Sequence, residues 1–320
     1  MSNDDSLNIY DQMMNLKEFF ISTPMIDELS EIIHKWHLNG FSGGVILGAN
    51  RIGKTAAIQH IKDRIFTRRN QKINCHFTSI APRDVGTFTG ILRQLCYSAE
   101  LSITDSTRAD IMANDLIHFL GESAANSDTP HNLILFIDEM QRLRPKQFEV
   151  FAELYDGLMN FGIHLSIFFV GNHTASIQLL DKMKENPQYE LIRGRFLLKF
   201  HKYYGIRKEI ELKACLREID QNYLFTDKNS YTEEYLWNQD VSEEWRLIDV
   251  AEIIWRVYEE CFCKEAGIES WPIQYFLSMI RILLFDFIPN NGVHDPILMS
   301  QMVEASINAS GLIPDQVELV

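Results

Sequence analysis

Residues 44–55 read Gly44-Val45-Ile46-Leu47-Gly48-Ala49-Asn50-Arg51-Ile52-Gly53-Lys54-Thr55. A short apolar run leads into a glycine, four free positions and Gly-Lys-Thr, which is the spacing of a P-loop between a strand and a helix. Glycines let backbone N–H groups wrap a phosphate, and a helix that opens near the lysine adds N–H groups and a positive dipole end. A chance glycine-rich turn would not need the flanking strand and helix. The stretch therefore predicts a nucleoside-triphosphate site.

The loop residues have separate expected roles. Lys54 is expected to reach the β- and γ-phosphates, and the Thr55 hydroxyl is expected to ligate Mg²⁺. ATP and Mg²⁺ are therefore the expected ligands. The predicted nucleotide contacts are Gly48, Asn50, Arg51, Ile52, Gly53, Lys54 and Thr55.

A second motif follows an unbroken apolar run. Residues 133–137 read Leu-Ile-Leu-Phe-Ile, as expected of a central parallel strand that is buried on both faces, and Asp138-Glu139 comes next. This is the Walker B pattern, in which Asp138 holds the Mg²⁺ and its hydration shell and Glu139 orients and polarises the attacking water. The alternative is that the two acids only add surface charge. Their place after a buried strand, downstream of a P-loop, favours the catalytic interpretation.

A third apolar run, residues 164–170, ends in Gly171-Asn172. In the additional-strand class of P-loop ATPases, a polar residue at this place is sensor 1, which senses the γ-phosphate and helps to place the water. An isolated asparagine after a strand is more often a turn residue. The order of the motifs favours sensor 1 for Asn172.

Two arginines precede the predicted fifth strand. Phe196, Leu198 and Phe200 alternate as in a strand, and Arg193 and Arg195 come just before it. In a ring ATPase this location directs an arginine finger toward the nucleotide of the neighbouring subunit, where its permanent charge stabilises the transferring phosphoryl group. The alternative is a pair of surface arginines. The pattern does not decide which of the two would be the finger.

The composition is that of a soluble globular protein, with 46% hydrophobic and 23% charged residues in a chain of 320. No apolar run approaches the roughly 20 residues of a membrane span, and the acidic start does not resemble a signal peptide. The five cysteines are odd in number and scattered, so we expect reduced thiols in a cytoplasmic, bacterial protein. The net charge of −14 argues against a generally basic surface for nucleic acid, but it leaves a local basic stripe open.

The order of segments predicts an α/β fold: a five-stranded parallel sheet of the AAA+ (additional-strand P-loop) type with flanking helices, followed by a smaller, mainly helical lid. We expect an N-terminal helical strap at 1–40, the ATPase core at 41–205 and the lid with a flexible tail at 206–320. Thr23 before Pro24 predicts a helix start. Helices are also expected at 85–99 and at 106–121, the second capped by Ser106 or Thr107, and 231–245 is read as a loop or insertion.

Together these parts resemble an AAA+ ATPase and, more narrowly, the TnsC/TniB/MuB regulators of DNA transposition, including the TnsC proteins of CRISPR-associated transposons. The resemblance covers roughly residues 20–205. It rests on the P-loop, on Val170-Gly171-Asn172, on Arg193-Gly194-Arg195-Phe196, and on Ile137-Asp138-Glu139-Met140-Gln141-Arg142-Leu143-Arg144-Pro145. Sensor 1 in the family is often threonine. Asn172 departs from this residue, but it belongs to the amide and hydroxyl side chains that are tolerated at the position.

The resemblance implies an ATP-dependent homo-oligomer, a hexameric or heptameric ring or a filament, that encircles duplex DNA. Such proteins link a target-selection complex to the transposase and hydrolyse ATP slowly. They grip DNA with residues between the second and third strands, where this chain offers Arg93, Thr107 and Arg108. These residues would contact the phosphate backbone without reading sequence.

Three alternatives compete with this interpretation. A helicase loader or initiator shares the ATPase parts, and the sequence leaves it open. A STAND-type nucleotide switch without DNA binding normally carries long repeats after its ATPase, and residues 206–320 show none. A small-molecule kinase is disfavoured by the Asp138-Glu139 pair, the added strand and the arginines before strand five.

Overall fold

The computed structural model describes residues 20–82, 86–222, 236, 245–264 and 267–312. The chain divides into two compact units. The sheet unit consists of Glu28–Ala49 and Lys54–Tyr203. The helical unit consists of the chain up to Asp27, the segment Asn50–Gly53 and the chain from Tyr204 onward. The expected division at residues 40 and 205 stays a prediction.

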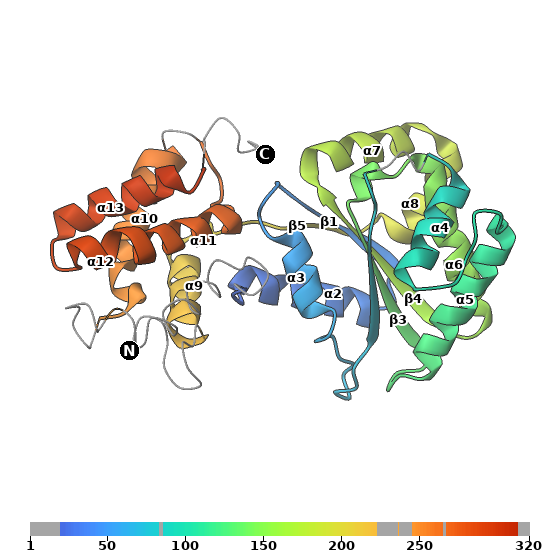
Figure 1. Ribbon diagram of the computed structural model, residues 1–320. Helices are drawn as coiled ribbons and strands as arrows, with labels where there is room; N and C mark the ends of the chain where they lie inside the picture. Colours follow the sequence, from blue (N-terminus) through green and yellow to red (C-terminus); the bar gives the residue numbers. More distant parts are fainter. Residues whose placement is uncertain (1–19, 83–85, 223–235, 237–244, 265–266, 313–320) are drawn as a thin grey trace. The chain divides into compact units, whose positions relative to one another are not determined.

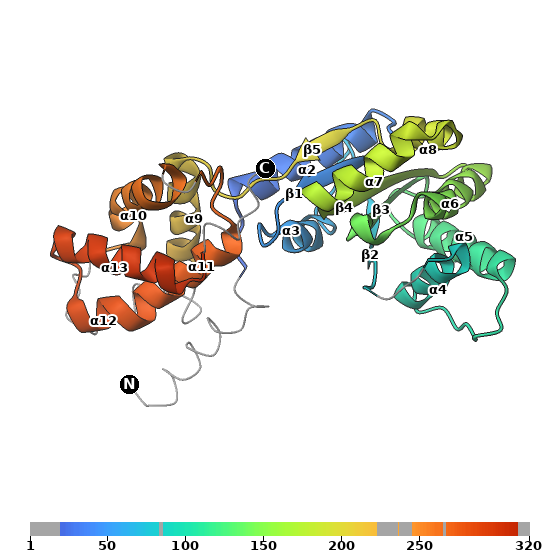
Figure 2. The same ribbon diagram turned by 90° about the horizontal axis from the view of Figure 1, so that it is seen from above.

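The sheet unit contains five parallel strands in the order β2-β3-β4-β1-β5, which confirms the predicted additional-strand sheet. β4 lies between β1 and β3, so three strands that carry motifs are neighbours, while β2 and β5 form the two edges (Figure 2). The strands are β1 (Gly43–Gly48), β2 (Asn74–Ser79), β3 (Asn132–Asp138), β4 (His164–Asn172) and β5 (Phe200–Lys202).

Helices cover both faces of this sheet: α2 and α3 lie on one face, and α4, α5, α6 and α8 lie on the other (Figure 1). α2 begins as predicted, because the Thr23 hydroxyl accepts a hydrogen bond from the Ile26 amide at 3.4 Å. The helices up to β5 are α2 (Pro24–Leu38), α3 (Lys54–Ile61), α4 (Phe88–Ser98), α5 (Ala109–Ala125), α6 (Phe148–Asn160), α7 (His173–Glu185) and α8 (Glu190–Phe196), with 3-10 turns η1 (Met140–Arg142), η2 (Pro145–Gln147) and η3 (Pro187–Tyr189).

Successive strand residues supply opposite faces of the core, as the two-residue period of a strand requires. Phe169 joins the aromatic cluster on the α6 and α8 side, with ring centroids 5.0 Å from Phe148 and 6.3 Å from Phe196. Its neighbour Phe168 faces the α2 side and stacks on Trp36 at 6.1 Å. Gly44 makes room for this indole, since a Cβ there would lie 2.7 Å from the Trp36 ring. The mainly apolar sequences of β1, β3 and β4 therefore reflect burial on both faces.

A buried histidine lies near the start of β4. The Nδ1 of His37 is 2.8 Å from the Ser166 hydroxyl, which in turn donates to the Phe41 carbonyl at 2.8 Å. Burial, followed by the charge of neighbouring His164, lowers the pKa of His37 to about 4. The folded sheet unit therefore keeps this imidazole neutral at neutral pH.

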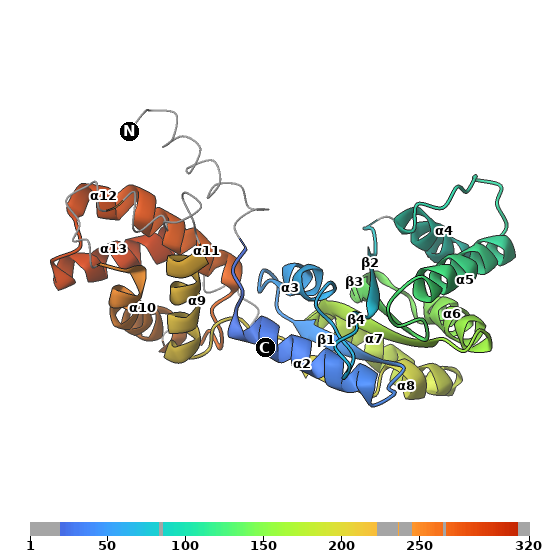
Figure 3. The same ribbon diagram turned by 90° about the horizontal axis from the view of Figure 1, so that it is seen from below.

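The helical unit has its own core, in which α10 and α11 both pack on α13 (Figure 3). Trp271 is fully buried and stacks on Tyr258 with ring centroids 4.3 Å apart. Its backbone exchanges two hydrogen bonds with Ile206, which ties the chain after β5 to the start of α11. The elements are α9 (Glu209–Asn222), η6 (Leu247–Val250), α10 (Ala251–Tyr258), η7 (Glu259–Lys264), α11 (Ile273–Ile282), η8 (Leu283–Phe287), α12 (Ile288–Asn291) and α13 (Pro296–Ala309). None of the described helices combines the length and the hydropathy needed to cross a membrane.

Two local predictions were wrong. Strand β5 begins only at Phe200, because Phe196 instead ends helix α8 and is buried against Phe169. Helix α5 begins at Ala109 with Arg108 at its N-cap position and no side-chain cap, whereas a cap at Ser106 or Thr107 was expected. The predicted insertion at 231–245 lies, apart from residues 236 and 245, outside the described residues.

Candidate active site

The candidate site is built at the carboxyl ends of three neighbouring strands, where ligands bind in open parallel sheets. β1 leads into the P-loop, β3 ends in Asp138, and β4 ends in Asn172. Since β4 lies between the other two strands, the sheet order alone brings these three segments together.

Lys54, the first residue of α3, points back into the P-loop. Its Nζ donates hydrogen bonds to the carbonyls of Gly48 at 2.9 Å and of Ala49 at 2.6 Å. The ammonium group is thus placed at the start of a helix, beside the loop that the sequence predicts to wrap a phosphate. This position fits the expected role of Lys54 as a phosphate ligand.

The tip of the P-loop, Asn50–Gly53, belongs to the helical unit. The amide of Gln274, in the first turn of α11, donates to the Arg51 carbonyl at 3.2 Å, and the Arg51 guanidinium lies 5.4 Å from the centre of the Tyr275 ring. Gly53 has φ of +91°, and a Cβ there would lie 2.7 Å from the side chain of Ile273. The second glycine of the motif is therefore needed both for its backbone conformation and for its close approach to α11.

Thr55 and Asp138 meet although 83 residues separate them. The Thr55 hydroxyl donates to Oδ2 of Asp138 at 2.6 Å, and the backbone amide of Glu139 donates to Oδ1 at 2.8 Å. The carboxylate is buried, with Asp138 2% exposed, so these two donors replace water. The sequence-predicted metal ligands are brought together in the sheet unit.

This pair of oxygen ligands fits Mg²⁺. Magnesium in nucleotide sites is bound by one or two protein oxygen ligands and completes its shell with phosphates and water. The described residues contain no cluster of three or more histidine, cysteine or acidic residues that could hold a metal by themselves. A hydroxyl beside a single buried carboxylate is what a nucleotide-bound Mg²⁺ requires, and it does not suit a self-sufficient metal centre.

Glu139 leaves the strand in a strained conformation, with φ of 61° and ψ of 39° in the left-handed region. Such backbone costs roughly 1–2 kcal/mol in a residue with a side chain, and it concentrates at functional sites. It turns the chain directly into η1, so that the carboxylate of Glu139 faces its own following residues. Oε2 accepts a hydrogen bond from Gln141 Nε2 at 2.7 Å and lies 3.1 Å from the Arg142 guanidinium.

Asn172 ends β4 and begins α7. Its side-chain oxygen accepts from the Ala175 amide at 2.9 Å, so it caps the helix, and its own amide donates to Gln141 Oε1 at 3.1 Å. Asn172 is thus part of the same hydrogen-bonded group as Glu139. Its predicted role as a γ-phosphate sensor stays a prediction.

Arg193 and Arg195 lie in the last turn of α8, whereas they were expected just before the fifth strand. Arg195 is held by its own subunit: it pairs with Asp156 at 2.9 Å, and its guanidinium lies 4.9 Å from the centre of the Tyr155 ring. Arg193 donates one hydrogen bond, at 3.2 Å, to the carbonyl of Lys184. The two predicted finger candidates therefore differ in how firmly they are held.

The three candidate DNA contacts lie on α4 and on the segment that leads into α5. Arg93 donates to the carbonyl of Asp105 at 2.9 Å, which connects α4 to this segment. The Thr107 hydroxyl oxygen accepts from a backbone amide three residues earlier. Arg108 forms a two-point ion pair with Asp110, at 2.7 and 3.1 Å. Arg93 and the segment are brought together, but the charge of Arg108 is compensated locally.

Sequence reasoning missed the contacts of Gln141 and Arg142. Both residues lie in the quoted Walker B segment, yet their side chains reach Glu139 only because the left-handed residue reverses the chain. Arg142 also donates to the carbonyl of Ile80, just after β2, at 2.5 Å. A polar residue two or three positions after the Walker B acid is the only signal that the sequence gives.

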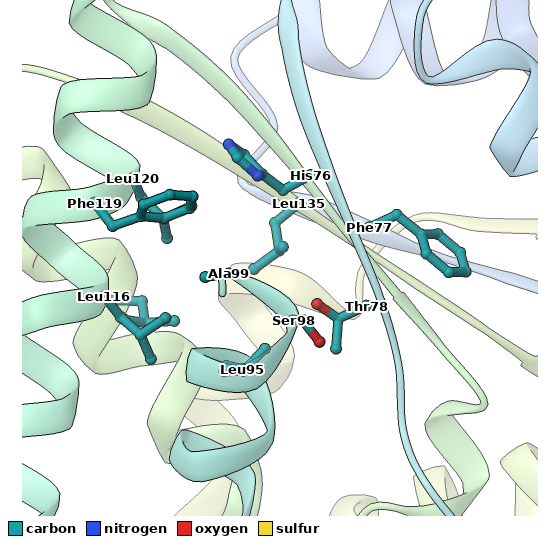
Figure 4. Close-up of a pocket in the computed structure, with 11 residues that line it drawn as sticks. His76, Phe77, Thr78, Leu95, Ser98, Ala99, Leu116, Phe119, Leu120 and Leu135 are labelled. Carbon is teal, nitrogen blue, oxygen red and sulfur yellow. The ribbon is translucent and has the colours of Figure 1, made fainter. Parts of the chain in front are cut away.

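A small cavity between β2 and helices α4 and α5 contributes none of the predicted site residues (Figure 4). Its walls include Leu95, Leu116 and Phe119, while the labelled Phe77 points away from it. His76 closes one side, with its Nε2 2.9 Å from the Ser123 hydroxyl. The residues that line the cavity include no aspartate, glutamate, lysine or arginine.

A match to a protein family agrees with this geometry. Residues 40–179 match the family model described as "AAA domain". No curated protein matches the chain. Among solved structures, Cdc6p from Pyrobaculum aerophilum is similar, with 12% identity and a TM-score of 0.45. The match covers 93% of this chain and 84% of that chain. The Orc1 protein of Aeropyrum pernix, solved in complex with DNA, gives 12% identity and a TM-score of 0.44, with 94% and 82% covered.

A Walker-type ATPase of Pyrococcus abyssi gives 15% identity and a TM-score of 0.45, with 90% of this chain and 72% of that chain covered. These likenesses are too distant to support a statement about function. The family match and the sheet order do not depend on them. Residues 40–179 match the AAA domain model, and the five parallel strands in the order β2-β3-β4-β1-β5 form an AAA+ fold.

Proposed function

We propose that this AAA domain hydrolyses ATP to ADP and phosphate and that hydrolysis regulates assembly on DNA. The observation that carries the hydrolytic part is the 2.6 Å hydrogen bond between Thr55 and the buried carboxylate of Asp138, with Glu139 next in the chain. It joins a hydroxyl that follows the phosphate-binding lysine to an acid that precedes a candidate general base. Mg²⁺ held there would neutralise charge on the phosphates.

Three residues have separate roles in the proposed hydrolysis. Lys54 binds the terminal phosphates, and Glu139 orients a water and accepts its proton as the water oxygen bonds to the γ-phosphorus. The bond from that phosphorus to the β–γ bridging oxygen breaks, and its electron pair leaves with ADP. Asn172, at the end of β4, contacts the γ-phosphate and reports its loss.

The substitution Glu139→Gln tests the hydrolytic part. It keeps the size of the side chain and its acceptor oxygen but removes the base. We expect phosphate release to fall about 10²–10⁴-fold, the usual contribution of a general base, while ATP still binds. Turnover at the parental rate would show that Glu139 is not the base.

We infer further that the protein acts as a homo-oligomer in which an arginine of one subunit completes the site of the next. Arg193 is the better candidate, because Arg195 would first have to leave Asp156 and the Tyr155 ring. An arginine that is held by one hydrogen bond to a carbonyl gives up less on entering a phosphate site than one that must break an ion pair. This choice deepens the sequence prediction, which left the two arginines equivalent.

The biological role that we propose is the regulation of DNA transposition, through a ring or filament around duplex DNA that links target selection to the transposase. It rests on the resemblance of the P-loop, Walker B and Arg193–Phe196 segments to that family. Arg93 is the preferred phosphate-backbone contact, since Arg108 is already paired.

Electron microscopy of the protein with duplex DNA, with and without a non-hydrolysable ATP analogue, tests this role. Rings or filaments on DNA that require the nucleotide would support it. Monomers that ignore both ligands would refute the DNA part. Co-purification with a helicase rather than a transposase would favour a loader or initiator.

A further inference from the structure

Gln141 uses both ends of its side-chain amide within the candidate active site. Its Nε2 donates to Oε2 of Glu139 at 2.7 Å, and its Oε1 accepts from the backbone amide of Asn172 at 3.1 Å. One side chain thus connects the proposed general base to the end of β4. Neither the family match nor the motif pattern assigns this residue a role.

The register of the sheet explains why a bridge is needed here. Ile137 pairs with Phe169, whereas Asn172 pairs with Gly48 at the start of the P-loop. β4 therefore continues for about two residues, or roughly 7 Å, beyond the end of β3. The side chain of Gln141, which leaves the end of β3 through η1, spans this offset.

The amide is also confined by its surroundings. A Cβ on Gly171 would lie 2.7 Å from Gln141 Oε1 and 2.4 Å from the Ser176 hydroxyl, so only glycine fits at this position of β4. Arg142 reaches the same Oε2 of Glu139 at 3.1 Å, but it also binds the Ile80 carbonyl. Gln141 and Arg142 both contact Glu139, and Gln141 also connects it to β4 through the Asn172 amide.

We propose that Gln141 is a positioning residue that fixes the carboxylate of Glu139 relative to the end of β4. This inference rests on the proposed function, in which Glu139 accepts the proton of the attacking water. A neutral amide donor orients the carboxylate, and its second contact sets the position of the base against the strand that ends in Asn172. Misplacement of a catalytic group by about 1 Å can cost on the order of 10²-fold in rate.

Two substitutions separate positioning from simple support. Gln141→Ala removes both hydrogen bonds. Gln141→Glu keeps the length and the acceptor for the Asn172 amide, but it replaces the donor to Glu139 with a second carboxylate oxygen. We expect both variants to lower kcat for phosphate release about 10- to 100-fold, with the Kd for a fluorescent ATP analogue changed less than about threefold.

Gln147 is the matched control. Gln147 is also a bridging glutamine, and it is buried: it accepts from the Arg144 amide at 2.7 Å and donates to the Thr87 carbonyl at 3.1 Å, and neither of these two partners is a proposed catalytic residue. Gln147→Ala is expected to lower Tm and to leave kcat within about twofold of the parent, measured well below the transition.

The outcomes are distinguishable. Parental kcat in Gln141→Glu would overturn the proposal, because support of the Asn172 amide alone would then suffice. Loss of folding in Gln141→Glu would also overturn it, since the residue would then be structural. Glu139→Gln is measured beside them: if it turns over like the parent, the proposed function fails, whatever the Gln141 variants do.

Discussion

Replacing Thr55 with valine removes one hydroxyl and almost nothing else, since the two side chains have nearly the same shape. The lost hydrogen bond, at 2.6 Å, reaches a charged carboxylate that is 2% exposed. Hydrogen bonds to charged groups contribute about 1.5–3 kcal/mol, and the buried carboxylate of Asp138 would lose one of its two donors. Asp138 keeps the Glu139 amide on its other oxygen, so the loss is confined to one partner.

We therefore expect Thr55→Val to destabilise the metal-free sheet unit by about 1.5–3 kcal/mol. For a unit of roughly 150–250 residues, each kcal/mol lowers Tm by about 2–4 °C, which gives a decrease of about 3–12 °C. Scanning calorimetry in EDTA measures it. The same variant should lose the Mg²⁺ dependence of ATP binding, because the hydroxyl is also the proposed metal ligand.

Thr55→Ser is the control, since it keeps the hydroxyl and loses a methyl group. It should remain within about 1 kcal/mol of the parent, the usual size of one methyl or methylene deletion. If valine leaves Tm unchanged, or if serine is as damaging as valine, the hydrogen bond to Asp138 does not stabilise the unit and the reasoning is wrong.

Three further outcomes are expected. The folded protein lowers the pKa of His37 from 6.5 to about 4, so the unfolded chain binds the proton more tightly. The free energy of unfolding should therefore fall by about 3 kcal/mol as the pH drops from 6.5 to 4. Urea titrations measure this dependence, and His37→Gln should flatten it. Gly171→Ala, whose Cβ would lie 2.7 Å from Gln141 Oε1, should reduce kcat about 10-fold or more while ATP still binds, and parental turnover would contradict the packing argument. Arg193→Ala should reduce hydrolysis by the assembled protein about 10³-fold or more, whereas Arg195→Ala should mainly lower Tm; the reverse result would exchange their roles.

The sheet and the Walker residues were predictable because their signals are local. The P-loop spacing is contiguous in the sequence, and the runs before Asp138 and Asn172 belong to strands that are buried on both faces, where most residues are apolar. The order of the motifs then predicted the meeting of Thr55 with Asp138, although 83 residues separate them. Motif order works here because parallel strands end at the same edge.

The errors come from features that only the tertiary structure decides. Phe196, Leu198 and Phe200 alternate like a strand, yet Phe196 packs against Phe169 from the end of a helix, and this aromatic contact outweighs the local pattern. The cap of α5 was expected at a hydroxyl, but Thr107 instead accepts from the Thr104 amide in the preceding turn. In both cases a competing partner was available that the sequence does not display.

The insertion of β4 between β1 and β3 has a consequence beyond the sheet order. It separates the phosphate-binding strand from the strand that carries the acids, so the Thr55–Asp138 bond joins segments that follow two strands that are not neighbours. Because Asn172 pairs with Gly48, the last residue of β4 lies level with the end of β1, whereas β3 ends about two residues earlier. Glu139 follows the shorter strand, so its carboxylate must be positioned relative to the end of β4. The left-handed conformation of Glu139 reverses the chain direction, and the side-chain amide of Gln141 connects the carboxylate to β4. The strained residue and the bridging glutamine are therefore two parts of one solution to the unequal lengths of β3 and β4.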